Sequence, residues 1–561
     1  MKGEFVCRVA ALGFLVCPVH SWAGESQTSP CPEPAVSEYP SLPEPWCYLG
    51  CAFDVRCDDG KNQTNFFLDR YDVYPDHPGL EMINTGHHVG THVAVQYRDP
   101  NGRWQWRPAV YPDRATMPEY PPTADPFSGC FFLRDPDRPG AYWVTYQRSD
   151  PNGCHALWYM SPRPASTCRD QPFEGHALLT YRNDPCCPGD PISRGGIWNL
   201  PVPFTLAGRS CLLSMPTGHR GDELPTAIWS TYPVVLDHEP NQTWADVPPN
   251  RYQHLWIQSD GQWQILRWNP IELWACVPSP GMNPGLQAQA TVFTVRSQTY
   301  LLVTGGATQQ ADDFSNPSSR GFIFLYRFVQ SPGPGPAMDY RVELVQAIVD
   351  PRNALPGSAA MVGGYIPGAL RPLPIRLTQG QADVPSFVSG LMRRQTSDPD
   401  RWVHDFGDGL QPVAGGWVVL RGAMDGEELR FTLEPARASD PNAGRDYLSA
   451  YGLAVLPRPD GDEVLFKTNY NGRFLVLRVP NQGGTFDLDR AVVLLDQNDI
   501  KPTATWETYF FSACFLGLFP SEEVEGGYDL VVPFSLEQRA ALDTATAEHL
   551  RHTFICLQGV K

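Results

Sequence analysis

Short runs of alternating apolar and polar residues recur along most of the chain, and many of them meet in pairs at a turn that contains Gly. Alternation with a period of two indicates strands with one buried face, and Asp-Gly or Asn-Gly accepts the positive φ of a tight hairpin turn. Four such hairpins are predicted at 91–110, 141–161, 254–270 and 463–480. Further strands are expected at 290–306, 321–329, 415–424, 427–435 and 528–534.

The C-terminal region adds two further elements. Residues 535–552 predict one short helix, because Ser535 and Gln538 have the spacing of a capping box. The run Thr553–Gln558 predicts a final strand, which we expect to pair with a strand from the N-terminal third of the chain. Such a pairing would close a ring of sheets and remove an open strand edge.

The number of hairpins favours an all-β protein, specifically a β-propeller of about five to seven four-stranded blades. Radial repetition buries many sheet faces without leaving long edges open to solvent. Two separate β-sandwiches would produce the same local pattern and are the alternative. The composition agrees with short strands joined by many turns, since the 561 residues include 49 Gly, 57 Pro and 12% aromatic residues.

The N-terminus predicts a secretory signal peptide over residues 1–23. Lys2 and Arg8 accompany an apolar run from Val9 to Val19, and Ser21-Trp22-Ala23 has a small-x-small cleavage pattern. No later apolar run approaches the roughly 20 residues needed to span a bilayer. We therefore expect a secreted or surface protein with no transmembrane segment after the signal peptide.

Residues 24–64 are rich in Pro, Ser, Glu and Cys and predict an irregular, disulfide-rich cap that precedes a propeller-like domain at 65–561. Of the 15 cysteines, 11 lie between Cys31 and Cys276, and an oxidising compartment would favour disulfides among them. Asn62 and Asn241 each begin an Asn-Gln-Thr sequon, so a glycoprotein is expected in a eukaryotic secretory pathway.

The charge balance is acidic, with a net charge of −18 and only 43 Lys and Arg residues. Phosphate binding needs concentrated positive charge, so nucleic acid is excluded as an expected partner. The cysteines lack the paired spacing of a zinc site. We expect no metal and no cofactor.

The stretch Pro459–Phe486 resembles an FG-GAP or VCBS repeat, the blade of integrin-type propellers, because Asp460-Gly461 precedes a strand and a Gly-containing hairpin follows. Weaker similarities to the same repeat occur at Glu525–Phe534, Ser259–Trp268 and Met424–Leu433. The resemblance implies that the stretch is one blade of several. The calcium loop of the family places oxygen ligands two and four residues before Asp-Gly, where this chain has Arg458 and Leu456, so calcium is not expected there.

A second resemblance is to five-bladed propeller glycosidases of the invertase type. The segments Met82–Gly86, Phe127–Cys130, Tyr181–Pro185 and Trp274–Pro278 follow the order of the motifs of that family. Thr85 and Ala275 stand where the family has its two catalytic carboxylates, and only the stabilising Asp184 is retained. Retaining glycoside hydrolysis needs both carboxylates, so the catalytic residues of an enzyme would be unknown.

Aromatic and histidine residues supply the remaining candidates for a site. Trp104 and Trp106 lie on one face of a predicted strand and can either stack on a sugar ring or pack between blades. His87, His88 and His92 lack an identifiable partner ligand, so hydrogen-bonded strand or loop histidines are favoured over a metal site. We expect a non-catalytic protein that recognises an extracellular glycan or protein, with Trp104, Trp106 and Asp184 as ligand-binding candidates. The alternative is a carbohydrate-active enzyme, a glycoside hydrolase.

Overall fold

The computed structural model describes strands along the chain and many turns of its C-terminal third; for some of these strands only the backbone is described. The described residues are 38–48, 53–54, 70–72, 80–87, 90–98, 104–109, 128–135, 137–138, 141–147, 155–162, 173–180, 201–214, 217–220, 228–231, 234–238, 241–247, 254–259, 262–265, 283–284, 289–308, 320–330, 340–348, 365–367, 372–378, 384–393, 416–439, 452–470, 473–509, 516–521, 523–538 and 550–561.

The described strands form seven antiparallel sheets of four to six strands and one separate two-stranded hairpin. The first sheet contains β3 (Arg70–Asp72), β4 (Leu80–His87), β5 (Gly90–Arg98) and β6 (Trp104–Ala109). The second contains β7 (Ser128–Arg134), β8 (Tyr142–Gln147), β9 (His155–Pro162) and β10 (Phe173–Thr180). The third contains β11 (Val202–Leu206), β12 (Arg209–Ser214), β15 (Val234–His238), β16 (His254–Ser259) and β17 (Gln262–Ile265). The separate hairpin is β13 (Thr217–Arg220) with β14 (Ile228–Thr231).

The later sheets repeat the same plan, and in three of them two short strands pair with the same neighbour. The fourth sheet contains β18 (Asn283–Pro284), β19 (Gln289–Val295), β20 (Gln298–Thr308), β21 (Arg320–Gln330) and β22 (Tyr340–Ile348). The fifth contains β23 (Tyr365–Pro367), β24 (Leu373–Ile375), β25 (Ser386–Arg393), β26 (Trp417–Asp425) and β27 (Glu428–Pro435). The sixth contains β28 (Leu453–Leu456), β29 (Glu463–Tyr470), β30 (Arg473–Val479) and β31 (Val492–Asp496). The seventh contains β32 (Trp506–Tyr509), β33 (Gly517–Pro520), β34 (Tyr528–Gln538), β35 (Leu550–Val560), β1 (Trp46–Tyr48) and β2 (Phe53–Asp54).

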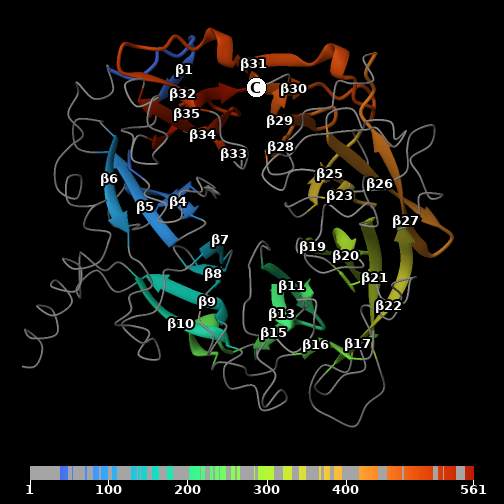
Figure 1. The fold of residues 1–561 in the computed structure, drawn as a ribbon. Helices are drawn as coiled ribbons and strands as arrows, with labels where there is room; N and C mark the ends of the chain where they lie inside the picture. Colours follow the sequence, from blue (N-terminus) through green and yellow to red (C-terminus); the bar gives the residue numbers. More distant parts are fainter. Residues whose placement is uncertain are drawn as a thin grey trace, which may run out of the picture.

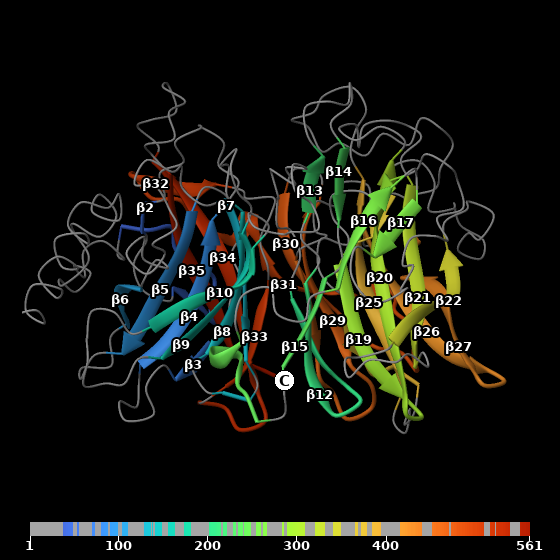
Figure 2. The ribbon, with the colours of Figure 1, turned by 90° about the horizontal axis from the view of Figure 1, so that it is seen from below.

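These sheets follow one another around a common centre in the order of the chain (Figure 1). In this view β6, β27 and β31, each the last strand of its sheet, lie toward the outside of the ring. Seen from the side, most strands run steeply between the two faces of the ring (Figure 2). The all-β, propeller-like architecture predicted from the sequence is therefore present, although only three of the seven described sheets have the predicted four strands.

The alternating pattern predicted the hairpins of this ring. All four predicted hairpins form, as the pairs β5–β6, β8–β9, β16–β17 and β29–β30. In β27 the apolar residues Leu429, Phe431 and Leu433 are buried, while the intervening residues face away from the core. One buried face for each strand is what a period of two dictates.

The seventh sheet joins the two ends of the described chain. β1 pairs antiparallel with β35 through Trp46–Leu557, Cys47–Cys556 and Tyr48–Ile555. The predicted pairing of Thr553–Gln558 with an N-terminal strand is therefore confirmed. A second attachment lies nearby, where the amide of Ser41 donates to the carbonyl of Lys501 at 2.8 Å and the amide of Lys501 donates back at 3.0 Å.

The predicted helix at 535–552 is wrong at both of its ends. Ser535–Gln538 continue strand β34, and Leu550–His552 begin strand β35. Val532, Phe534 and Leu536 are all buried, so the period of two extends through the predicted N-cap. Burial of Leu536 in the core and the ladder to β35 outweigh the local preference of Ser535 for a helix start.

The predicted irregular cap at 24–64 also needs correction where the structure describes it. β1 and β2 belong to the seventh sheet, because both pair with β35. Trp46 is also buried in the core, and Tyr48 packs against that core. No disulfide joins the three cysteines whose side chains are described, Cys47, Cys211 and Cys556. The domain boundary at residue 64 stays a prediction, and the signal peptide at 1–23 lies outside the described residues.

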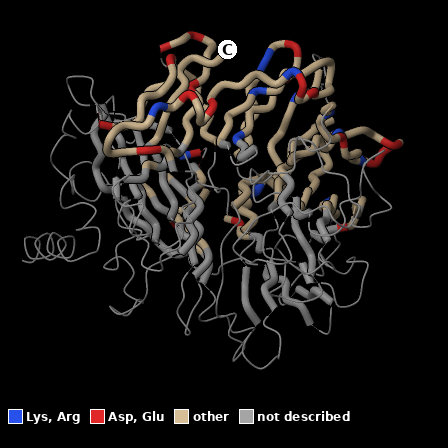
Figure 3. Tube along the Cα trace, turned by 45° about the horizontal axis from the view of Figure 1, so that its top comes forward, with Lys and Arg blue, Asp and Glu red and all other residues tan. Residues whose placement is uncertain are grey.

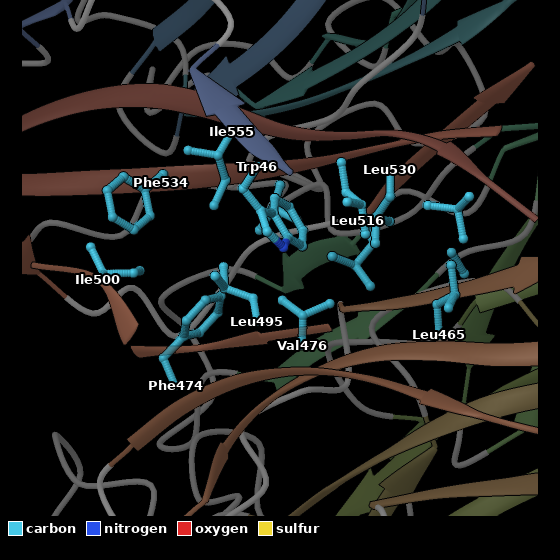
Figure 4. Packing of buried hydrophobic residues seen from close by; sticks show 14 of the residues in the cluster. Trp46, Leu465, Phe474, Val476, Leu495, Ile500, Leu516, Leu530, Phe534 and Ile555 are labelled. Atoms are coloured by element: carbon cyan, nitrogen blue, oxygen red, sulfur yellow. The ribbon is translucent and has the colours of Figure 1, made fainter. Parts of the chain in front are cut away.

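The largest described core lies between the sixth and seventh sheets. Trp46 stands among apolar side chains from both sheets, with Leu495 and Phe474 on one side and Ile555 and Phe534 on the other (Figure 4). Its indole Nε1 donates to the carbonyl oxygen of Leu494 at 2.7 Å, so the strand that closes the ring also bonds to β31. The closing strand thus holds two sheets together through one buried side chain.

Candidate functional site

The hairpin β13–β14 is the candidate functional site because it departs from the repeated plan of the ring. It is inserted between the second and third strands of the third sheet. β12 pairs with β15 as far as Ser214–Val234, and β13 pairs with β14 from Thr217–Thr231 onward. Two residues on each strand separate these pairs, so the inserted hairpin continues the β12–β15 ladder in the same register.

The inserted hairpin continues the two strands past the last β12–β15 pair. Arg220 lies six residues after Ser214, a distance of roughly 20 Å at about 3.3 Å per residue for an extended strand. In the side view β13 and β14 lie at the end of the sheet opposite the β11–β12 turn (Figure 2). His219 and Trp229 are register partners and share one face of the hairpin, whereas Arg220 and Ile228 share the other.

The base of the inserted hairpin, which is the β12–β15 part of the third sheet, is buried in the protein core. Leu212, Leu213 and Leu236 are fully buried in the third sheet. Beside them Arg209 Nε donates to Asp237 Oδ2 at 2.8 Å, and this ion pair lies at the end of the sheet away from the hairpin. Burial, followed by the charge of Asp237, raises the pKa of the Cys211 thiol to about 12, so this thiol stays protonated. The base therefore acts as an anchor from which the hairpin extends.

The ligand-binding candidates from the sequence are not brought together in the described part of the structure. Trp104 and Trp106 lie on β6, the last strand of its sheet, and alternation places them on the same face of that strand. Asp184 lies outside the described residues. The role of these three residues in binding stays a prediction.

The histidine and invertase-type motifs are only partly described. His87 ends β4 and pairs with Gly90, while His92 on β5 pairs with Thr85; His88 lies outside the described residues. Within the described ranges no three His, Cys, Asp or Glu side chains form a group that could hold a metal. The segments Tyr181–Pro185 and Trp274–Pro278 lie outside the described residues, and seven sheets differ from the five blades of the invertase-type family.

The buried acidic side chains of the described residues all hold strands or turns together. They are Asp135, Asp237, Asp462, Glu463 and Asp529. Their hydrogen-bond donors are, respectively, the Tyr159 hydroxyl, the Arg209 guanidinium, the Arg376 amide and guanidinium, the Arg478 guanidinium and the Gly559 amide. Burial of a carboxylate is tolerated only with such donors, so these residues serve the fold.

A cluster of titratable and aromatic side chains joins the second and third sheets. Tyr159 and Asp135 are almost completely buried, and the Tyr159 hydroxyl donates to Asp135 Oδ2 at 2.5 Å. Burial raises the pKa of Asp135, and the hydrogen bonds from Tyr159 and the Asp137 amide oppose that rise. Burial, aided by the bond to Asp135, also raises the pKa of Tyr159 well above its usual value. Trp143 of the second sheet packs edge-on against Trp244, 5.8 Å between ring centres, and Trp244, in the turn after β15, packs against His238 of the third sheet at 4.8 Å.

The Asp-Gly loop that suggested FG-GAP repeats is the turn between β28 and β29. Asp462, one residue beyond Gly461, accepts hydrogen bonds from the amides of Arg376 (2.8 Å) and Arg458 (3.3 Å). The Arg376 guanidinium donates to its other oxygen at 3.2 Å. The carboxylate therefore ties the fifth sheet to the sixth, and its lone pairs face hydrogen-bond donors.

Of the two predicted glycosylation sites, Asn241 is described and Asn62 is not. Asn241 is exposed in a turn after β15. Its sequon partner Thr243 is also exposed and donates from Oγ1 to Asp246 Oδ2 at 2.8 Å. The turn thus presents the Asn241 amide to solvent, as glycan attachment requires, and glycosylation stays a prediction.

Acidic and basic residues are interspersed along the described turns, with no block of positive charge (Figure 3). Arg421 and Glu434, for example, face each other across β26 and β27 at 2.7 Å. Within the described residues no helix is long and apolar enough to cross a membrane. The extracellular glycan or protein partner expected from the sequence stays a prediction.

Comparison with known proteins gives no family. No protein-family model matches the chain, and no curated protein sequence matches it. Solved structures that resemble it include a mutant of Trypanosoma rangeli sialidase displaying trans-sialidase activity, which is 11% identical with a TM-score of 0.29, over 64% of this chain and 54% of that chain. A second is Trypanosoma rangeli sialidase in complex with 2,3-difluorosialic acid as the covalent intermediate, which is 10% identical with a TM-score of 0.29, over 64% of this chain and 53% of that chain. The match spans about half the length of these sialidases, and likeness at this level supports no argument about function.

Proposed function

We propose that the protein is a secreted or surface-exposed, propeller-like recognition protein that binds an extracellular glycan or protein through the inserted hairpin β13–β14. One observation carries this proposal. Among the described sheets, only the third is continued by a separate two-stranded hairpin that keeps the register of two of its strands. This extension neither closes the ring nor belongs to a four-stranded sheet.

The physical argument is that the buried part of the third sheet holds the hairpin β13–β14 in a fixed position. The sheets of the ring hold the base of the hairpin in place. The entropy lost on ordering the contact surface when a partner binds is therefore smaller than for a flexible loop. His219 and Trp229 share one face of the inserted hairpin. An indole offers a flat apolar face for the C–H groups of a sugar ring and is also the side chain most enriched at the centre of protein interfaces.

The buried carboxylates support recognition without catalysis. A glycoside hydrolase needs two carboxyl groups about 5–10 Å apart beside the scissile bond, one of which must attack or activate water. Each of the five described buried carboxylates instead accepts hydrogen bonds that hold the fold. A carbohydrate-active enzyme, with its carboxylates outside the described residues, is the alternative.

The test compares two substitutions on opposite faces of the inserted hairpin. The protein is first applied to a glycan array and to a panel of purified ectodomains, and the affinity for any ligand found is then measured for Trp229→Ala and Ile228→Ala. We expect Trp229→Ala to weaken binding at least about tenfold, the effect of losing about 1.4 kcal/mol, and Ile228→Ala to bind like the parent. Equal affinities for the parent and both variants, and for a protein in which 217–231 is replaced by a Gly-Ser linker, contradict the proposal.

The same samples test the alternative. The parent is incubated with fluorogenic glycosides of the common sugars, and release of the fluorophore is followed. Turnover that persists through repeated purification would establish the carbohydrate-active enzyme. Binding to the array without turnover would support the recognition protein.

A further inference from the structure

Two cysteines lie directly opposite each other in the ladder that closes the ring. Cys47 on β1 is the register partner of Cys556 on β35. The Cys47 Sγ donates to the backbone carbonyl of Cys556 at 3.7 Å, so the sulfur of one residue reaches the main chain of the other. Residues directly opposite each other in an antiparallel ladder have Cα atoms about 4.5 or 5.5 Å apart. Both spacings lie within the roughly 4.4–6.8 Å range of Cα separations found in disulfides.

The two side chains also share one face of the sheet. Trp46 and Leu557, and likewise Tyr48 and Ile555, are register partners that contribute to the core against the sixth sheet. Alternation then places Cys47 and Cys556 together on the opposite face. Cys47 is half-buried, whereas Cys556 is only 2% exposed.

We propose that Cys47 and Cys556 form a disulfide site that covalently seals the ring. The accessible Cys47 thiolate attacks one sulfur of a small-molecule disulfide, such as glutathione disulfide, and releases one thiol. The Cys556 thiolate then attacks the Cys47 sulfur of the mixed disulfide and releases the second thiol. The two protein thiols lose two protons and two electrons, which the reagent disulfide gains in becoming two thiols.

The consequence for stability follows from chain topology. The cross-link joins positions separated by 509 residues. The restriction that a disulfide places on the unfolded chain grows with the length of the loop it closes, so this position is close to the most effective one available in the chain. The bond also removes fraying of β1, which has only three residues in its ladder. The inference does not depend on the ligand or on the proposed recognition function.

The test is made on the full-length protein equilibrated with either glutathione disulfide or dithiothreitol. Remaining thiols are blocked with N-ethylmaleimide, and peptides are then mapped by mass spectrometry without reduction. We expect a Cys47–Cys556 peptide pair in the oxidised sample and separately blocked Cys47 and Cys556 peptides in the reduced sample. We also expect the oxidised protein to melt several degrees above the reduced protein.

Matched variants show whether this pair is responsible. Cys47→Ser and Cys556→Ser should each abolish the peptide pair and reduce the difference in melting temperature between the oxidised and reduced samples. Cys211→Ala, which alters a buried thiol in the third sheet, should leave that difference as in the parent. Two findings would each overturn the proposal: Cys47 or Cys556 bonded to a different cysteine, or both blocked as thiols after equilibration with glutathione disulfide. A Cys47→Ser variant with an unchanged oxidised–reduced difference would overturn the stabilising role.

Discussion

The hydroxyl of Tyr159 on β9 donates a 2.5 Å hydrogen bond to Asp135 Oδ2, one residue beyond the end of β7 in the same sheet. Both residues are buried, and the second carboxylate oxygen of Asp135 accepts from the amide of Asp137 at 3.0 Å. Burial raises the pKa of Asp135 in spite of these two bonds. The second sheet therefore contains a buried carboxyl group whose pKa is raised by burial and lowered by the hydrogen bond from Tyr159.

Substitution of Tyr159 by Phe should destabilise the protein more at neutral pH than in acid. Because the folded pKa of Asp135 is raised, its contribution to stability is complete below the unfolded pKa of about 3.9 and is lost as pH rises through the folded pKa. Removing the Tyr159 donor raises that folded pKa further, and above it an ionised, buried oxygen lacks a partner, at a cost of about 1–3 kcal/mol.

Urea unfolding of the parent and Tyr159→Phe between pH 4 and pH 8 measures this effect. The ionic strength is kept the same at every pH, because salt screens interactions between charges. The difference in free energy of unfolding should grow with pH. A difference that is constant across the range would contradict the assignment, because loss of packing alone does not titrate.

Loss of the closing strand should destabilise the whole ring. A chain ending at His552 lacks most of β35, including Ile555 and Leu557, which pair with β1. We expect this chain to lose the cooperative melting transition of the parent. A chain ending at His552 that melts at the parent temperature would contradict closure through β35.

A milder substitution quantifies the same contact. Ile555→Ala leaves a cavity in the core around Trp46 and should cost about 2–5 kcal/mol. Val493→Ala is the matched control, because Val493 is 51% exposed on β31, and it should cost less than about 0.5 kcal/mol. Equal losses from both substitutions in denaturant unfolding would show that the core around Trp46 is misassigned.

Two glycines with positive φ should respond differently to Ala. Gly461 (φ +135°) lies so close to Leu377 that an added Cβ would stand 2.6 Å from its carbonyl oxygen. Gly426 (φ +63°) has open space around the same position. We expect Gly426→Ala to cost about 1–2 kcal/mol from backbone strain alone, and Gly461→Ala to cost clearly more because the turn between β28 and β29 must move. Thermal denaturation compares them, and a smaller loss for Gly461→Ala would be contrary to this geometry.

Calcium removal should leave stability unchanged. The Asp462 carboxylate accepts from the amides of Arg376 and Arg458 and from the Arg376 guanidinium, and these donors occupy the positions that a cation would need. The melting temperature should therefore be the same in calcium and in EDTA. A fall of many degrees in EDTA would reveal a structural ion, since a ligand bound only to the folded state stabilises it by mass action.

Expression through a eukaryotic secretory pathway should add a glycan at Asn241, which is exposed. Asn241→Gln should abolish the mass shift that peptide N-glycosidase produces on the peptide containing this residue. Thr243→Ser is the matched control, because it retains both the sequon and a hydroxyl that can donate to Asp246. An unmodified Asn241 peptide in secreted parent protein would disprove the prediction.

Much of the ring was predictable because hairpins are local. The dipeptide Asn471-Gly472 in the sequence and the alternation on both sides of it predict β29 and β30, since both signals come from neighbouring residues. Ser535 shows the limit of local signals. Its capping-box spacing favours a helix, yet burial of Leu536 against a distant sheet decides the conformation. The strand at Trp46 could not be predicted from local signals either, because its partner Leu557 lies almost at the other end of the chain.

The candidate site was harder to predict than the fold. Alternation predicts that Trp104 and Trp106 lie on one face, but it carries no information about strand order, which puts β6 last in its sheet. The inserted hairpin was missed because β13 and β14 have four residues each and follow a strand with the same register. Only the knowledge that Ser214 pairs with Val234 would show that Thr217 and Thr231 continue the ladder.

The seventh sheet can form only after the whole chain has been synthesised. Of the described strands, β1 leaves the ribosome first, whereas its partner β35 is the last to be made. At about 5–20 residues per second, Leu557 emerges ~25–100 s after Trp46. Throughout that interval Trp46 lacks the surroundings that bury it, and the first strand translated is among the last to be secured. A newborn chain of this protein therefore depends on whatever shields its N-terminal segment during that delay.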